Sequence, residues 1–207
     1  MPRTGERGGP QTRARIAEAA AELFLERGFD AVTVAQVARA AGVSSVTVFK
    51  HFPRKEDLFL DRSEEAAELL RSAVRDRAAG VDALTALHEA MAGLVQDRHP
   101  LSGLDDRSVD FFRTVAGSPA LVSRAREIAA DLQQVLAEEL ARDPGSPRDA
   151  TLLAAFVLAG YGTVLVETAR RRTGGEPASA VVEDHCARLE RLFAALRTGV
   201  GNPPDRP

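Results

Sequence analysis

Apolar residues recur at helical spacing along almost the whole chain. In the segment covering residues 12–27, four of them stand at i, i+4, i+7 and i+8 and therefore share one face of an amphipathic helix. These four are Ile16, Ala20, Leu23 and Phe24. We expect Thr12 to cap the beginning of this helix and Gly28 to end it.

The next two helices are predicted to be short and to be separated by a turn that contains Gly42. The second begins after Thr33, with a glutamine three residues later as in a capping box. The third covers about residues 45–51, with Ser44 as its N-cap, and ends because Pro53 biases the preceding residue away from helical geometry. Two helices joined by so short a turn form a helix-turn-helix, whose second helix can enter the major groove of DNA.

Longer helices are expected after this motif. They cover about residues 55–79, 82–96, 106–116, 118–142, 146–172 and 178–197. Serine–proline pairs at 118–119 and 146–147 supply the N-cap and the first helical residue of two of them. Because no segment shows the alternation of a β-strand, the predicted fold class is all-α.

The composition is that of a soluble globular protein, since 44% of the 207 residues are hydrophobic and 28% are charged. The longest apolar stretch, residues 152–166, is shorter than the roughly 18 residues of a membrane span, so no span is expected. No apolar segment follows the N-terminal arginines, so no secretory signal is expected either. The single cysteine, Cys186, excludes an internal disulfide and fits a reducing cytoplasm, and no cofactor or metal ligand set is predicted.

Charge divides the chain in two. The first 55 residues hold nine basic and five acidic side chains, a net charge of +4, whereas the remainder carries −7 of the total of −3. A basic beginning on an acidic body suggests an anionic partner for the first part only. The predicted parts are a flexible basic arm at 1–8, a helix-turn-helix domain at 9–55 with a connecting helix from 55, a helical domain at 56–199 and a flexible tail at 200–207.

A resemblance to the TetR family of bacterial transcriptional regulators covers roughly residues 12–60. It rests on two overlapping stretches, TRARIAEAAAELFLERGFDAVTV and TVAQVARAAGVSSVTVFKHFPRKEDL. The resemblance implies three N-terminal helices that bind DNA and a remaining helical domain that senses a ligand and dimerises. The function it implies is that of a dimeric repressor that leaves a palindromic operator when a small molecule binds the C-terminal domain.

The third helix carries the candidate DNA contacts. One group is expected to form the small core of the motif: Val34, Val37, Ala38, Val43, Val48 and Phe52. Another group falls on and around the outward side of the helix: Ser45, Val46, Thr47 and Lys50. Hydroxyl groups can reach phosphates or base edges, Val46 can meet a thymine methyl, and Lys50 can donate to guanine or to phosphate. The alternative is that any short exposed helix carries some polar residues.

The resemblance adds further DNA contacts. Four residues match family positions at helix N-termini or on the recognition helix: Thr33, Ser44, Thr47 and His51. Phe49 matches a position usually held by tyrosine, whose hydroxyl binds a phosphate. Phenylalanine cannot make that bond, so ring packing against a sugar replaces it.

Basic residues flank the motif on both sides. Lys55 matches a family lysine that holds the DNA backbone, and beside Arg54 at the start of a predicted helix it favours a docked phosphate. Four N-terminal arginines are candidates for an arm that reaches the minor groove: Arg3, Arg7, Arg13 and Arg15.

The last two predicted helices carry more apolar residues than one helical pair needs. The resemblance implies that they pair with their copies in a four-helix bundle, which sets two recognition helices roughly 34–36 Å apart. The predicted interface residues are Phe156, Gly160, Tyr161, Val164, Val182, His185, Leu189 and Leu192. The alternative is the internal core of a monomer.

The helices between residues 82 and 142 are expected to enclose an effector pocket. Its candidate residues combine apolar surface with one polar group: His88, Met91, Phe111 and Phe112. The alternative is that all four belong to an ordinary core.

Two competing functions remain open. An all-α enzyme would need a nucleophile with a base, a metal cluster or a phosphate loop, and the four histidines belong to no such motif. His185 and Cys186 are adjacent, but neighbours on a helix diverge by about 100° and do not form a reactive pair. We therefore expect no catalytic residue. The other competitor is a regulator that binds DNA without sensing a small molecule.

Overall fold

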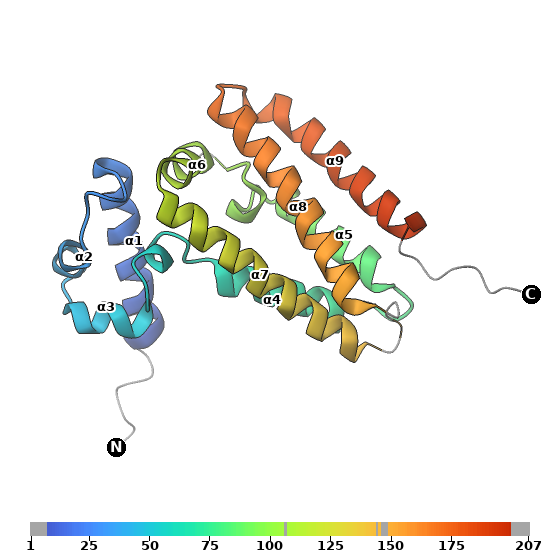
Figure 1. Ribbon diagram of the computed structural model, residues 1–207, viewed down its shortest axis with the longest axis horizontal. Helices are drawn as coiled ribbons and strands as arrows, with labels where there is room; N and C mark the ends of the chain where they lie inside the picture. The colour runs from blue at the N-terminus through green and yellow to red at the C-terminus, as the bar shows by residue number, and fades with distance from the viewer. Residues whose placement is uncertain (1–7, 106, 144, 146–148, 200–207) are drawn as a thin grey trace, which may run out of the picture. The chain divides into compact units, whose positions relative to one another are not determined.

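The all-α fold class is confirmed by the computed structural model of the chain, which describes residues 8–105, 107–143, 145 and 149–199 (Figure 1). Every regular element among these residues is a helix. The elements are α1 (Gly8–Arg27), α2 (Val34–Ala40), α3 (Ser45–His51), the 3-10 helix η1 (Glu56–Leu58), α4 (Ser63–Arg75), α5 (Ala83–Gln96), the 3-10 helix η2 (Pro100–Ser102), α6 (Ser108–Gly117), α7 (Pro119–Arg142), α8 (Ala150–Thr173) and α9 (Ala178–Gly199).

Several expectations lie outside the described residues. They are the arm as far as residue 7 with Arg3 and Arg7, the Ser146–Pro147 helix start, and the tail at 200–207.

The described residues form two compact units. Unit 1 consists of the chain up to Asp61 together with Arg113–Arg126, and unit 2 consists of Arg62–Phe112 together with the chain from Glu127 onward. Helices α6 and α7 therefore contribute residues to both units.

Local signals place the first three helices. Thr33 caps α2 in a full capping box, and Gly28 ends α1 with a positive φ of 83°, as predicted. The prediction that Thr12 caps α1 is wrong, because the helix already begins at Gly8. Pro10 lies in the first turn, where a missing backbone N–H costs nothing, so the helix extends one turn further than the apolar pattern indicates.

The predicted helix over residues 55–79 is also wrong, because the chain breaks between η1 and α4. Leu58 and Phe59 are adjacent yet both buried, and the Phe59 ring packs edge-on against Phe24 with 5.8 Å between ring centroids. Both side chains therefore enter the core of unit 1 from η1 and the residue after it, before α4 begins. Helix α4 then starts at Ser63 with two glutamates in its first turn.

Unit 2 is built around α5, α8 and α9. Figure 1 shows α8 and α9 running side by side in opposite directions. Leu87, Met91, Leu153, Val157 and Phe193 are all buried in its core. Asp82 caps α5 and Asp149 caps α8 through side-chain oxygens, so α8 begins at Ala150.

Candidate nucleic-acid interface

Helix α3 is held in place by a cap at its beginning and by an apolar face beneath it. The Ser44 hydroxyl accepts a hydrogen bond from the Thr47 N–H at 3.1 Å. Gly42 in the preceding turn has a φ of +64°, which a side chain rarely tolerates. Val48 and Phe52 are buried, whereas Val34 and Val43 of the predicted core are half-buried. The turn and the small core therefore fix the orientation of α3.

The opposite face of α3 is open to solvent. Val46 is 66% exposed and Phe49 is 50% exposed. Lys50 is also exposed, whereas Ser45, Thr47 and His51 are half-buried. Val46, Phe49 and Lys50 thus stand on the outward side of one small helix, whose Val48 is buried.

Arg13 is a structural residue that the sequence pattern misplaced. It lies in α1, where its guanidinium donates to the backbone carbonyl of His51 at 2.6 Å and to that of Asp61 at 3.3 Å. The same group lies over the Phe52 ring, 4.1 Å from its centroid. The prediction that Arg13 belongs to a minor-groove arm is therefore wrong, because the side chain ties the C-terminal end of α3 to α1. Arg15 on the same helix is exposed.

Lys55 has a partner inside unit 1. Its Nζ donates to the Phe29 carbonyl at 2.7 Å and lies 4.2 Å from the centroid of the Phe29 ring. Burial lowers the pKa of this ammonium, against an opposing effect of Asp30 and Glu56. Because η1 is a single 3-10 turn, the phosphate site predicted at the start of a long helix does not form there. A contact of Lys55 with the DNA backbone stays a prediction.

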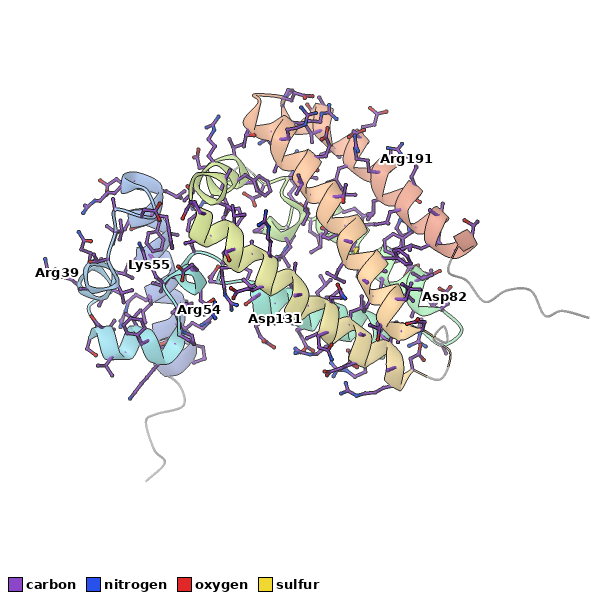
Figure 2. The ribbon with its side chains drawn as sticks, in the orientation of Figure 1. Arg39, Arg54, Lys55, Asp82, Asp131 and Arg191 are labelled. Carbon is purple, nitrogen blue, oxygen red and sulfur yellow. The ribbon has the colours of Figure 1, made fainter. Side chains whose placement is uncertain are left out.

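Other basic side chains of unit 1 reach solvent. Arg39 on α2 is exposed and points outward (Figure 2). Arg39 is not among the predicted DNA contacts, although its place in the last turn of the first helix of the motif is a signal for one.

Residues far along the chain complete unit 1. Arg124 on α7 donates to Asp57 at 2.7 Å, and both side chains are largely buried. Ser118, just before α7, bonds Asp30 at 3.1 Å. The beginning of α7 is thereby bonded to η1 and to the loop after α1 within unit 1.

Known proteins share this arrangement. The family model for bacterial regulatory proteins of the tetR family matches residues 16–61. The transcriptional regulator TcmR of Streptomyces glaucescens is 30% identical over 158 residues, which are 74% of this chain and 70% of TcmR. The chain belongs to the TetR family. It is therefore a helix-turn-helix DNA-binding transcriptional regulator, and α2 and α3 are the two helices of that motif.

Two further relatives agree with this assignment. The transcriptional repressor AcnR of Corynebacterium glutamicum is 35% identical over 86 residues, covering 42% of each chain. Among solved structures, FadR of Thermus thermophilus, a TetR-family repressor in complex with lauroyl-CoA, superposes with a TM-score of 0.57 at 26% identity. That match covers 94% of this chain and 98% of FadR.

The dimer interface predicted for this TetR-family regulator needs correction. Four of its residues are buried within the single chain, between α8, α9 and their neighbours: Tyr161, Val164, His185 and Leu189. The Tyr161 hydroxyl donates to the Leu101 carbonyl at 3.2 Å, and a ring nitrogen of His185 lies 2.8 Å from the Thr168 hydroxyl. Tyr161 and Val164 lie on the inner face of α8, and His185 and Leu189 are buried residues of α9, so all four belong to the core of the single chain.

Gly160 and Leu192 meet inside the same chain. A Cβ added to Gly160 would lie 2.3 Å from a methyl carbon of Leu192, so the glycine allows α8 and α9 to approach. Val182 and Leu192 are half-buried. Of the predicted set, Phe156 stands out on the surface of α8 with an exposed fraction of 45%, and Leu152 and Val166 of the same helix are exposed at 45% and 70%.

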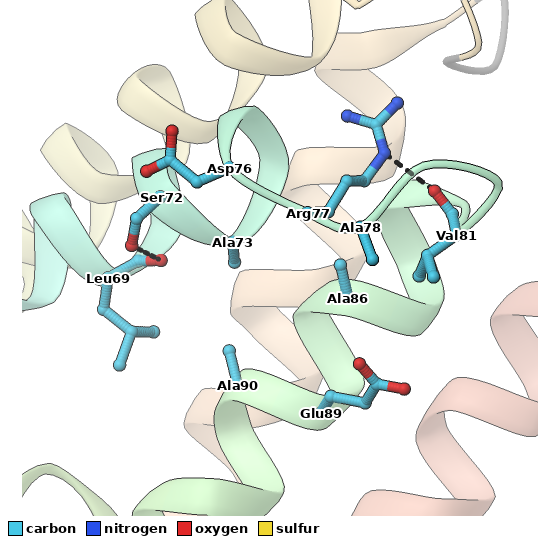
Figure 3. Close-up of a pocket in the computed structure, with 10 residues that line it drawn as sticks. All are labelled: Leu69, Ser72, Ala73, Asp76, Arg77, Ala78, Val81, Ala86, Glu89 and Ala90. Carbon is cyan, nitrogen blue, oxygen red and sulfur yellow. Dashed lines mark hydrogen bonds between the residues drawn. The ribbon is translucent and has the colours of Figure 1, made fainter.

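A cavity of about 400 Å³ lies between α4 and α5 of unit 2 (Figure 3). Four of the residues that line it are alanines, and Asp76 and Glu89 bring two carboxylates to it. Arg77 at its end is engaged, since it donates to the Val81 carbonyl at 2.8 Å and to Asp143 at 2.7 Å.

The four predicted effector residues do not line this cavity. Met91 is buried in the core, and the His88 ring packs on Phe193 with 5.0 Å between centroids. Phe111 and Phe112 are half-buried and meet each other edge to face. An effector role for these four residues stays a prediction.

The described residues contain no group of three or more His, Cys, Asp or Glu side chains placed to hold a metal ion. By length and composition, α8 is apolar enough to cross a membrane, which for a single helix is weak support for a span. Six of its residues are buried in unit 2, among them Leu153 and Val157. The same helix leaves the apolar surface around Phe156 uncovered within one chain.

Proposed function

We propose that this protein is a cytoplasmic, homodimeric repressor that binds a palindromic operator through α3 of each chain and leaves it when a small molecule binds unit 2. The observation that carries the proposal is the recognition helix itself. It is capped at Ser44, clamped by Arg13 and turned so that Val46, Phe49 and Lys50 face solvent. A fixed helix with an open outer face is what insertion into a major groove requires.

The DNA contacts follow from positions on the two motif helices. The N-caps Thr33 and Ser44 stand at helix N-termini, where backbone N–H groups favour phosphate. Ser45 and Thr47 are at the DNA-facing beginning of α3, and Lys50 and His51 are in its last turn. The Lys55 ammonium has three N–H donors, and one of them donates to the Phe29 carbonyl. The other two can therefore donate to a phosphate.

The dimer forms through the outer face of α8. Only 22% of the apolar 18-residue stretch of this helix is buried within the chain. Leu152, Phe156 and Val166 are among its exposed residues. Contiguous exposed apolar surface on a soluble protein marks an interaction site. A second copy covers it symmetrically, in line with the two-fold symmetry of a palindromic operator.

Small-molecule release is supported by the FadR complex with lauroyl-CoA, which places a ligand on a related repressor. In this chain the cavity between α4 and α5 is the candidate effector site. Release requires a coupling of about 1–3 kcal/mol between effector and DNA binding, and the coupling must be reciprocal. The protein acts as a regulator without a catalytic step.

Duplex DNA selected from a random-core pool tests the proposal by fluorescence anisotropy at several salt concentrations. If each half neutralises three or four phosphates, log K falls against log[salt] with a slope of roughly −5 to −7. Lys50→Ala on the recognition helix should weaken binding at least tenfold, since one direct contact is lost in each half-site.

A matched control is Arg191→Ala, which removes an exposed basic side chain of α9 (Figure 2). This variant should bind as the wild type does. Equal binding by both variants, or binding that ignores salt, contradicts the proposal.

A further inference from the structure

The exposed face of α3 carries two large apolar side chains. Val46 and Phe49 are 66% and 50% exposed, although α3 has only seven residues. Among the described residues of unit 1, Leu25 on α1 is the one other large apolar side chain that is comparably exposed, at 44%. Because Val46 and Phe49 are three residues apart, they lie next to each other on one face of the helix.

The hydroxyl groups near this face are partly engaged within the helix cap. The oxygens of Ser44 and Thr47 lie 2.9 Å apart and share a hydrogen bond, so one of their two O–H donors is used between them. The Ser44 oxygen also accepts the Thr47 N–H. Lys50 is therefore the main exposed donor on the helix, and two apolar side chains stand beside it.

Apolar side chains discriminate among base edges. In the major groove, guanine, adenine and cytosine present donors and acceptors, whereas thymine adds an apolar C5-methyl group. An apolar side chain placed against a polar edge would strip it of water without replacing the hydrogen bond, which is costly. Against a thymine methyl, the same side chain buries apolar surface on both partners.

We propose that α3 recognises thymine by its methyl group, with Val46 and Phe49 packing on C5-methyls in each operator half-site. This inference rests on the proposed function and specifies the base that the recognition helix reads. It also gives Phe49 a role that needs no hydroxyl. Burial of one methyl group is worth about a fourfold change in affinity, so two symmetry-related methyls amount to about 15-fold.

Replacement of thymine by deoxyuridine tests the inference, since the two bases differ by the methyl group alone. The full-length protein first selects its site from a random-core duplex pool. A set of duplexes is then made, in each of which one T·A pair and its symmetry-related pair in the other half-site are changed to U·A. At the pairs facing α3 the affinity should fall about 15-fold. Changes at thymines outside the protected half-sites control for altered base stacking.

The variants Val46→Ala and Phe49→Ala show which side chain reads which methyl. Each should bind the thymine site more weakly and should lose the difference between thymine and uracil at its own base pair. Leu25→Ala is the matched control, because it truncates an apolar side chain of similar exposure on another helix. This control should keep the full difference.

The outcomes separate the inference from the proposed function. If the protein selects no sequence at all, the proposed function fails. If it selects a site but binds the uracil duplex as tightly as the thymine duplex at every position, thymine recognition is refuted and the regulator assignment stands. A difference that persists in both alanine variants would refute the assignment to Val46 and Phe49.

Discussion

Arg13 offers a direct test of how the recognition helix is held. Arg13→Ala removes two hydrogen bonds from a charged donor, to the carbonyls of His51 and Asp61, and the contact with the Phe52 ring. Hydrogen bonds to charged groups are worth about 1.5–3 kcal/mol, and the cation–π contact adds about 0.5–1 kcal/mol. The Asp61 bond is long at 3.3 Å, so it contributes at the lower end.

These contributions add to about 3.5–5.5 kcal/mol, but Arg13 is only half-buried and water replaces part of them. We therefore expect Arg13→Ala to lower the free energy of unfolding of unit 1 by about 2–4 kcal/mol. The chain contains no tryptophan, so far-UV circular dichroism in urea is the suitable probe of unfolding. Two transitions are anticipated because the chain has two compact units. Amide hydrogen exchange of Val48 and Phe52, whose N–H groups bond within α3, reports on this helix directly.

Two further variants serve as comparisons for Arg13→Ala. Arg13→Lys keeps the charge but cannot make both carbonyl bonds, so it should recover about half of the loss. Arg15→Ala, an exposed position on the same helix, should change stability by less than about 0.5 kcal/mol. If Arg13→Ala behaves like Arg15→Ala in both measurements, the clamp does not hold α3 and the reasoning is refuted.

Three further predictions concern unit 2. Gly160→Ala places a Cβ against the Leu192 side chain and should leave the protein about 1 kcal/mol less stable in urea than Gly162→Ala, whose added Cβ meets no atom within 4 Å. Equal stabilities of the two variants would refute a steric role of Gly160. Burial lowers the pKa of His185, so below pH about 6.5 the unfolded chain binds a proton that the folded chain does not. Stability should fall toward acid by up to about 1.4 kcal/mol per pH unit, and His185→Gln should remove that slope in urea titrations. Phe156→Asp should convert the proposed dimer to a monomer in sedimentation without unfolding unit 2, because Phe156 is 45% exposed; a persisting dimer would contradict the proposed interface.

The helices and their caps could be predicted because the interactions that define them are local. Thr33 and Ser44 bond backbone groups three residues away, a spacing that the sequence displays directly. The break before α4 was not predictable in this way, since it depends on Phe59 reaching the Phe24 ring of another helix.

Side-chain roles set by distant partners could not be predicted from local patterns. Arg13 finds its acceptor 38 residues away and Lys55 finds one of its own 26 residues away, so neither contact is visible in the local sequence pattern. On α8 the apolar pattern runs over two faces. Helical spacing alone therefore does not predict that Tyr161 is buried and that Phe156 is exposed.

Hydroxyl-radical footprinting of the selected duplex tests the central claim most directly. The account predicts two protected half-sites related by two-fold symmetry, with centres about 10–10.5 base pairs apart, and loss of both footprints in Lys50→Ala. A single unpaired footprint, or protection that survives unchanged in this variant, would contradict the claim that α3 from each of two chains reads the operator.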